Sequence, residues 1–170
     1  MQESILKVSQ LDTRLGPLVA IANERALYFL VFADGCKVEQ EIEGLKSKTK
    51  SEIVPGKSSP ICSIEKELGQ YFDGNLKEFK TPLFFFGSSF QRSVWEELMK
   101  IPYGKTISYS ELSTAIGKPT ACRAVAQANG ANAFAVVIPC HRVIQINGEL
   151  GGYAAGVARK KWLIDHEKQR

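Results

Sequence analysis

The chain has 170 residues, of which 44% are hydrophobic and 24% charged, as is ordinary for a globular protein of one large or two small domains. Its first residues show no long apolar region behind a basic start, and no segment approaches the roughly 18 apolar residues of a membrane span, so we expect a cytoplasmic protein without membrane contact. Residues 1–85 carry 11 Lys and Arg against 12 Asp and Glu, whereas residues 86–170 carry 11 against 6, so the two halves have net charges of −1 and +5. A basic second half suits attraction to a polyanion.

The cysteines are few and widely spaced, with no C-x-x-C pair and only two histidines to accompany them. This pattern argues against a disulfide framework and against a zinc site, so we expect no metal. The four are Cys36, Cys62, Cys122 and Cys140.

The first part of the chain has the pattern of β structure. A strand around residues 6–8 leads to a turn at 14–17, and the apolar runs 18–22 and 26–32 form a hairpin, which predicts a small antiparallel sheet. Residues 34–60 are rich in Lys, Glu, Ser, Gly and Pro.

In that polar stretch we expect a weak helix over 38–45 and a mobile surface loop over 46–60. Ser63 then caps a helix through Phe72, which the Asp73-Gly74-Asn75 turn ends. The run 84–86 is either a strand or an extended linker.

The second part of the chain is mainly helical. Ser88 or Ser89 caps a helix that ends by Gly104, and its apolar face holds Phe90, Val94, Trp95 and Leu98. A second helix covers 110–116 and a third covers 120–129. Two short helices joined by a Gly-containing turn are typical of a helix-turn-helix, although any αα-corner gives the same pattern.

The third helix has two distinct faces. Small apolar residues recur at spacings of three and four and predict a buried stripe of Ala121, Ala124, Val125 and Ala128. On the opposite side Arg123 is the one long cation, and its neighbours are short or uncharged: Thr120, Ala126 and Gln127. This face suits close approach to a partner, although a solvated arginine explains it equally well.

The stretch 135–144 contains the strongest chemical signal. An apolar run ends at Pro139, where a buried strand should stop and turn, so Cys140 should lie at the mouth of a core element. A free thiol, with a pKa near ~8.5, becomes a useful nucleophile beside a base or a cation, and His141 and Arg142 supply one of each. The alternative is that Cys140 is simply a small buried hydrophobe.

The remaining chain is a short alternating segment, a loop and a helix. Residues 143–146 alternate, Asn147-Gly148 predicts a type I′ hairpin turn, and a Gly-rich loop over 151–156 precedes a last helix from Val157 to about Glu167. On that helix Glu167 lies on the same side as Leu163 and Ile164. A buried charge needs a partner, most simply a histidine, unless the helix end is frayed.

The segment Pro139-Cys140-His141-Arg142-Val143 resembles the active-site signature of the 6-O-alkylguanine-DNA alkyltransferases, also called methylated-DNA-protein-cysteine methyltransferases. The resemblance extends from about Phe90 to Glu167 and is loose before that. It implies repair of 6-O-alkylguanine, and of 4-O-alkylthymine, in double-stranded DNA. The alkyl group moves once to Cys140 after the damaged nucleotide is flipped, without a cofactor or an obligate protein partner, in a monomer that binds the minor groove.

The same resemblance assigns roles to single residues. Glu167 holds His141, which takes the thiol proton through a water, and Arg123 enters the base stack. Tyr109 hydrogen-bonds and protonates the departing guanine, and Asn132 braces the active-site turn. Val143 and the loop residues Tyr153, Ala154 and Ala155 belong to the pocket; the family commonly has glycine in place of Ala155.

The family's fold implies a ribonuclease-H-like α/β domain over residues 1–87 and a mainly α domain with the helix-turn-helix over 88–170. Some members carry zinc ligands in the first domain, for which this chain has no matching set. Two other classes stay open. A non-catalytic alkyltransferase-like sensor would lack the motif cysteine, and a cysteine hydrolase would need an oxyanion hole and would turn over. A plain transcription factor is a weaker option because no effector domain is evident.

Overall fold

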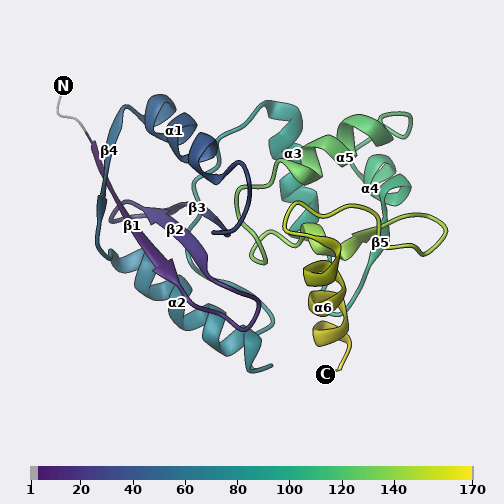
Figure 1. The fold of residues 1–170 in the computed structure, drawn as a ribbon. Helices are drawn as coiled ribbons and strands as arrows, with labels where there is room; N and C mark the ends of the chain where they lie inside the picture. Colours follow the sequence, from purple (N-terminus) through teal and green to yellow (C-terminus); the bar gives the residue numbers. More distant parts are fainter. Residues whose placement is uncertain (1–3, 170) are drawn as a thin grey trace. The chain divides into compact units, whose positions relative to one another are not determined.

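The computed structural model describes residues 4–169, which divide into two compact units between Phe84 and Phe85. The first unit contains a small mixed sheet with two helices, and the second contains four further helices (Figure 1). This arrangement confirms the expected two-part α/β class. Within the described residues, no helix is both long and apolar enough to cross a membrane.

The sheet of the first unit has four strands in the order β3-β2-β1-β4. Strand β1 (Ser4–Leu11) pairs antiparallel with β2 (Leu18–Ala22), and β2 pairs antiparallel with β3 (Leu27–Phe32), which confirms the predicted hairpin. The expectation of a wholly antiparallel sheet was wrong, because β4 (Ser51–Pro55) pairs parallel with β1. A parallel partner requires a crossover, and the segment between β3 and β4 supplies one.

That crossover contains the helix α1 (Val38–Thr49), so the predicted mobile loop over residues 46–60 was also wrong. The helix buries little beyond Val38 and Leu45, and its charges follow the helix dipole, with acidic residues in the first turn and basic residues in the last. It ends at Lys50, which takes a left-handed conformation with φ of 50°. The polar composition therefore marked an exposed helix and an edge strand.

Helix α2 (Ser59–Phe72) lies along the sheet and buries its apolar face there (Figure 1). It begins before Ser63, the predicted cap, because Pro60 fits the first turn of a helix. The hydroxyl of Ser63 instead lies 2.7 Å from that of Thr81. Residues 84–86 form no strand, although Phe84 stacks on Tyr28 with ring centroids 4.9 Å apart.

The second unit is built on helices α3 (Ser89–Leu98), α4 (Tyr109–Ala115) and α5 (Cys122–Gly130), and α5 packs against both of the others. Ser88 and Gln91 form a capping box at the start of α3, so Ser88 is the one of the two predicted caps that the structure shows. The indole nitrogen of Trp95, on α3, donates to the carbonyl of Ala128 on α5 at 2.9 Å. This buried bond fixes the two helices against each other.

Helix α5 begins later than expected, at Cys122, and its buried face is shifted from the predicted stripe. Val125, Ala128 and Asn129 are buried, whereas Ala124 is exposed and Ala121 half-buried. Residues spaced by three and four do share one side, but the buried side of α5 includes Asn129, whose Nδ2 lies 3.4 Å from the carbonyl oxygen of Cys140. A polar residue therefore takes the place of a small apolar one.

The apolar run before Cys140 is buried but is not a strand, which corrects the sequence expectation. Residues 135–137 form a turn in which Val136 has φ of +69°. The turn leads to a short 3₁₀ helix, η1 (Cys140–Arg142), and then to β6 (Val143–Ile144), which pairs parallel with β5 (Ile107–Ser108). Cys140 therefore begins a helical turn inside the unit.

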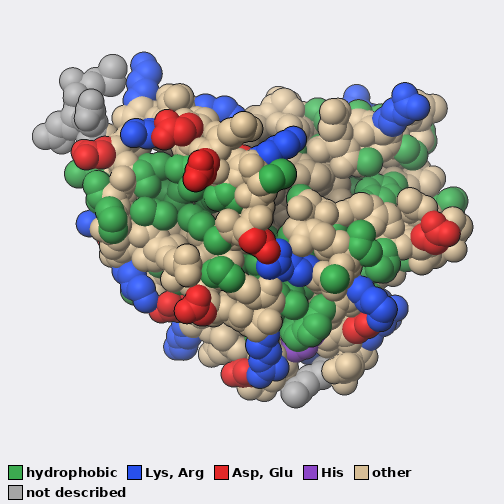
Figure 2. Space-filling view, viewed as in Figure 1, with side chains coloured by type: hydrophobic (Ala, Val, Ile, Leu, Met, Phe, Trp, Pro, Cys, Tyr) green, Lys and Arg blue, Asp and Glu red, His purple; other side chains and the backbone are tan. Residues whose placement is uncertain are grey.

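The chain turns after β6 and ends in helix α6 (Val157–Lys168). The amide of Gly148 donates to the carbonyl of Gln145 at 2.9 Å, and in this turn only Gly148 has positive φ, so the predicted type I′ geometry was wrong. The last helix has the predicted extent. On the face shown in Figure 2, positive and negative side chains of the described residues are interspersed.

Candidate active site

Cys140 stands directly after Pro139 and is buried, with 7% of the residue exposed. Its amide donates to the carbonyl of Ile138 at 2.7 Å. Two asparagines contact it: the side-chain amide of Asn132 lies 3.3 Å from Sγ, and that of Asn129 lies 3.4 Å from the carbonyl oxygen. These contacts hold the thiol in place, and little of the residue is accessible to solvent.

Asn132 joins several parts of the turn that carries the thiol. Its Nδ2 donates to the carbonyls of Phe134 and Ile138, at 3.1 and 2.9 Å, and its Oδ1 accepts from the amide of Phe134 at 2.9 Å. These bonds satisfy carbonyls that no regular ladder pairs. The structure therefore places Asn132 where a bracing role requires it.

His141 and Glu167 form a buried pair. Nε2 of the imidazole lies 2.8 Å from Oε2 of the carboxylate, and the side chains are 0% and 2% exposed. An ionised carboxylate only accepts hydrogen bonds, so Nε2 carries the proton and Nδ1 presents a lone pair. Nδ1 is buried and has no hydrogen-bond partner among the described residues. The imidazole is therefore the tautomer that can accept a proton at Nδ1.

The environment sets the charges of these groups. Burial raises the pKa of Glu167, but hydrogen bonds and charges from His141 and Arg142 outweigh it and lower that pKa to about 2. Burial lowers the pKa of His141, against the opposing effect of Glu167. Burial raises the pKa of Cys140, against the hydrogen bond from Asn132. At neutral pH the resting site thus holds a carboxylate, a neutral imidazole and a protonated thiol.

Arg142 was expected as a cation beside the thiol, and the structure gives its guanidinium other contacts. Nε and Nη2 donate to Oε1 and Oε2 of Glu167 at 2.7 and 3.1 Å, and Nη1 donates to the carbonyl of Ile101 at 2.6 Å. The guanidinium carbon also lies 5.7 Å from the ring centre of Tyr103. Arg142 therefore acts on the carboxylate that holds the histidine.

The cation whose charge lowers the pKa of Cys140 is Lys160, which the sequence analysis did not single out. Its side chain is 0% exposed, and Nζ donates to the carbonyl of Gly152 at 3.0 Å. The signal was present in the sequence. Lys160 lies on the same helical stripe as Leu163, Ile164 and Glu167, so the reasoning applied to Glu167 applied equally to it.

Two tyrosines lie near the thiol. Burial and the charge of Cys140 raise the pKa of Tyr109, which a hydrogen bond with Asn129 partly opposes. The Tyr153 hydroxyl is buried without a hydrogen-bond partner among the described residues, and burial raises its pKa well above the ordinary value. Both phenols are therefore protonated at neutral pH and available as hydrogen-bond donors.

Comparisons with known proteins give a consistent result. A family model described as 6-O-methylguanine DNA methyltransferase, DNA binding domain, matches residues 89–169. A methylated-DNA-protein-cysteine methyltransferase of Methanosarcina barkeri is 38% identical over 159 residues, covering 93% of this chain and 94% of that protein. The chain belongs to the methylated-DNA-protein-cysteine methyltransferase family. The relative in Mycobacterium bovis is 41% identical over 160 residues, covering 94% of this chain and 91% of that protein.

Solved structures of methyltransferases extend the similarity to the whole fold. That of the Mycobacterium tuberculosis O6-methylguanine methyltransferase has a TM-score of 0.83 and 37% identity, covering 97% of this chain and 94% of the other. A structure of the Mycobacterium tuberculosis protein in complex with DNA has a TM-score of 0.82 and 34% identity, covering 97% and 93%. Both units of this chain therefore have counterparts in the methyltransferase family.

The other predicted site residues of this methyltransferase family member lie in different surroundings. On and just before α5, the predicted DNA-contacting residues are all exposed: Thr120, Arg123, Ala126 and Gln127. Helix α5 also carries Asn129, whose side-chain amide lies near the carbonyl oxygen of Cys140. One helix therefore carries both the exposed Arg123 and a contact to the backbone of Cys140. Val143 is fully buried in β6, Ala154 is exposed and Ala155 is half-buried.

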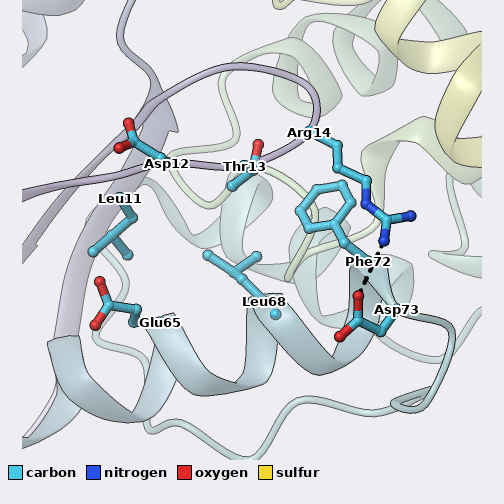
Figure 3. A pocket seen from close by; sticks show the side chains of 9 residues that line it. Leu11, Asp12, Thr13, Arg14, Glu65, Leu68, Phe72 and Asp73 are labelled. Atoms are coloured by element: carbon cyan, nitrogen blue, oxygen red, sulfur yellow. Dashed lines mark hydrogen bonds and ion pairs between the residues drawn. The ribbon is translucent and has the colours of Figure 1, made fainter.

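A separate hollow of about 310 Å³ lies within the first unit, between the end of β1 and helix α2 (Figure 3). Leu11, Leu68 and Phe72 give it apolar walls, and the exposed pair of Arg14 and Asp73, 3.1 Å apart, lies among its lining residues. None of the methyltransferase site candidates lines it. Among residues 4–169, no cluster of three or more His, Cys, Asp or Glu could hold a metal ion.

Proposed function

We propose that this protein repairs DNA by transferring the alkyl group of 6-O-alkylguanine, and of 4-O-alkylthymine, to Sγ of Cys140. One observation carries the assignment: a buried cysteine next to a histidine whose tautomer a buried carboxylate fixes. The named relatives are methylated-DNA-protein-cysteine methyltransferases, which supports the same reaction here.

The first step is removal of the thiol proton. The resting thiol is protonated, because burial raises the pKa of Cys140. His141 is neutral and offers Nδ1 as the acceptor, reached through a water because adjacent residues seldom face each other. The imidazolium that forms is stabilised by the ionised Glu167, which Arg142 keeps in place.

The second step is displacement at carbon. The thiolate of Cys140 attacks the alkyl carbon, the sulfur–carbon bond forms, and the bond from carbon to the guanine 6-oxygen breaks with its electron pair moving onto the base. Tyr109 gives a proton to the departing guanine and recovers one from the imidazolium. The amide of Ala154 lies near the guanine 6-oxygen in this proposal. In sum, the thiol hydrogen replaces the alkyl group on guanine.

The product is a thioether, which is chemically stable, so each molecule reacts once. Both the nucleophile and the base belong to the chain, and the reaction as written needs no cofactor. The second unit contacts DNA through α4 and α5 as a helix-turn-helix in the minor groove, where Arg123 fills the place of the flipped nucleotide. A monomer suffices for this mechanism.

For the domains, we propose a first domain over residues 1–87 and a second over 88–170. The first is proposed to have a ribonuclease-H-like fold, which its mixed four-stranded sheet and its crossover helix support. The second contains all the residues to which the mechanism gives a chemical step.

The test is to incubate the protein with a duplex oligonucleotide that contains one 6-O-methylguanine and to measure its intact mass. The wild type should gain one methyl group on Cys140, and Cys140→Ala should gain none while still binding the duplex. Cys62→Ala, which removes an exposed cysteine, is the matched control and should react fully. Binding without mass gain in the wild type would indicate a sensor, and turnover without an adduct would indicate a hydrolase.

A further inference from the structure

Asn129 is a polar residue on the buried side of α5. It is 5% exposed, and the other buried residues of this helix are Val125 and Ala128. Its Oδ1 is buried and has no hydrogen-bond partner among the described residues. An acceptor that is buried without a partner destabilises a fold, whereas a leucine of nearly the same size carries no such cost. Packing alone therefore does not account for an asparagine at this position.

The contact with Cys140 fixes the direction in which the amide of Asn129 faces. A carbonyl oxygen only accepts hydrogen bonds, so Nδ2 and not Oδ1 lies 3.4 Å from the carbonyl oxygen of Cys140. That carbonyl oxygen also accepts from the backbone amide of Val143, so it stays paired without Asn129. The fold does not require the bond from Asn129, although the bond lies directly beside the nucleophile.

The second partner of Asn129 is Tyr109, the first residue of α4. Helices α4 and α5 pack against each other, and the side chain of Asn129 forms a hydrogen bond with that of Tyr109 (Figure 1). Because Oδ1 has no partner, Nδ2 is the donor and the tyrosine oxygen accepts. The phenol hydrogen is then left for another acceptor. Burial and the charge of Cys140 raise the pKa of Tyr109, and this bond opposes them because it favours the ionised phenol.

We propose that Asn129 is a positioning residue for alkyl transfer: its amide holds the oxygen of Tyr109 and the carbonyl of Cys140, so that the tyrosine hydrogen stays available to the departing base. The proposal rests on the function proposed above, in which Tyr109 gives its proton to guanine and recovers one from the imidazolium. While that proton is on guanine, Nδ2 stabilises the phenolate oxygen. Asn129 itself neither gains nor loses a proton.

Other groups also act on Tyr109, and they are the same in every variant of Asn129. Cys140 lies on η1, and the ammonium of Lys160 on α6 lies 5.7 Å from the centre of the tyrosine ring. The backbone before α6 is close as well, since a Cβ added at Gly151 would lie 3.3 Å from Cε2 of Tyr109. A change in the behaviour of Tyr109 therefore reports the substitution at Asn129.

The informative variant is Asn129→Leu, because leucine keeps the size of the side chain and removes both the donors and the unpaired acceptor. Its melting temperature should equal or exceed that of the wild type. Ser58→Ala is the matched control, since the hydroxyl of Ser58 is also buried without a partner among the described residues but belongs to the first unit. Failure of Asn129→Leu to fold, or a large loss of stability, would make Asn129 a structural residue and overturn the proposal.

The first readout needs no DNA. The isotope-labelled Cζ carbon of tyrosine, followed by NMR, reports ionisation of the phenol, and the signal of Tyr109 is identified by its loss in Tyr109→Phe. We expect the pKa of Tyr109 to be higher in Asn129→Leu than in the wild type, because the donor that favours the phenolate is gone. Ser58→Ala should follow the wild type. Superimposed titrations of the wild type and Asn129→Leu would overturn the proposal.

The second readout is the single-turnover rate of methyl transfer from duplex DNA. Asn129→Leu should slow transfer about fivefold or more, since it weakens a proton donor, and Ser58→Ala should leave the rate unchanged. In the Tyr109→Phe background the same leucine substitution should slow transfer by no more than about twofold, because the group that Asn129 positions is absent. Equal factors in the two backgrounds would show that Asn129 acts independently of Tyr109 and would overturn the positioning role.

The third readout is the reaction with free 6-O-methylguanine base. Asn129→Leu should slow this reaction as well, because Tyr109 acts on the base itself and not on the duplex. An unchanged rate with the free base would place Asn129 in DNA binding and contradict the proposal. If the wild type gained no methyl group from DNA, the proposed function would fail, while the tyrosine titration would still test the bond between Asn129 and Tyr109.

Discussion

Arg142 and Glu167 form a bidentate ion pair inside the second unit, with Nε 2.7 Å from Oε1 and Nη2 3.1 Å from Oε2. The two side chains are only 8% and 2% exposed. The planar guanidinium fixes the plane of the carboxylate, so that Oε2 also receives Nε2 of His141. Arg142 therefore sets the orientation of the carboxylate that holds His141.

In the proposed mechanism Glu167 acts only through His141, so the two residues should behave as a unit in kinetics. Either His141→Ala or Glu167→Gln should slow transfer strongly, and the double variant should be little slower than the worse single one. The measurement is the single-turnover rate of methyl transfer from duplex DNA in all four proteins. Losses that multiply across the two sites would show that the residues act independently.

Glu167 should also make stability depend on acidity. Its pKa is lowered from 4.5 to about 2 in the folded state, so the unfolded chain binds the proton first and stability is lost as the pH falls from about 4.5 toward 2. The linked free energy is on the order of 3 kcal/mol. Urea unfolding at several pH values should therefore show that the difference in free energy of unfolding between wild type and Glu167→Gln becomes smaller in acid.

The control for the acid experiment lies on the same helix. Asp165 is exposed and pairs with Lys161, so Asp165→Asn should change stability by only a few tenths of a kcal/mol. A difference in free energy of unfolding between wild type and Glu167→Gln that stays constant from neutral pH to pH 3 would contradict the lowered pKa of Glu167.

Arg123 offers a test of nucleotide flipping. Arg123→Ala should slow transfer from duplex DNA at least about tenfold while the reaction with free 6-O-methylguanine base stays nearly unchanged, since a free base needs no extrusion. Arg92→Ala, which removes an exposed arginine of α3, is the matched control and should affect the DNA reaction less. Equal losses on duplex and free base would place Arg123 in the fold or the pocket.

The preference of the protein for small or large alkyl groups should depend on Ala155. Alanine adds a methyl group where the family commonly has glycine, and this half-buried residue belongs to the loop proposed to line the pocket. A mismatch of one methylene is worth roughly 1 to 3 kcal/mol of discrimination. Ala155→Gly should therefore raise the rate for benzylguanine relative to methylguanine. An unchanged ratio of the two rates would mean that the Ala155 methyl group points away from the substrate.

The helical stripe on α6 predicts that Glu167 faces inward unless the helix end is frayed, and the structure buries it. The same stripe contains Lys160, but lysine is so commonly exposed that spacing alone does not predict its burial. The contacts of Arg142 could not be predicted from the sequence, because its partners Ile101 and Glu167 are distant along the chain. Local spacing identifies which residues face inward, and only the fold shows which of them meet.

The wrong predictions in the two units have related physical origins. The direction of a strand relative to its partner depends on the crossover between them. The crossover helix α1 is polar and rich in lysine, so its composition resembles that of a surface loop. The apolar run before Pro139 has the composition of a buried strand, yet the carbonyls of Phe134 and Ile138 are paired locally, by Nδ2 of Asn132 and by backbone amides, so no ladder is needed. Periodicity does not report such side-chain hydrogen bonds.

The burial of Cys140 has a consequence for the lifetime of the unreacted molecule. A protein that reacts once must keep its sulfur intact until it meets a lesion, and oxidants and soluble electrophiles attack the exposed thiolate first. Cys36 and Cys62 are exposed, whereas Cys140 is buried and that burial raises the pKa of its thiol. Burial therefore protects the Cys140 sulfur from oxidants and soluble electrophiles better than it protects the exposed thiols, so the nucleophile is preserved until a lesion is met.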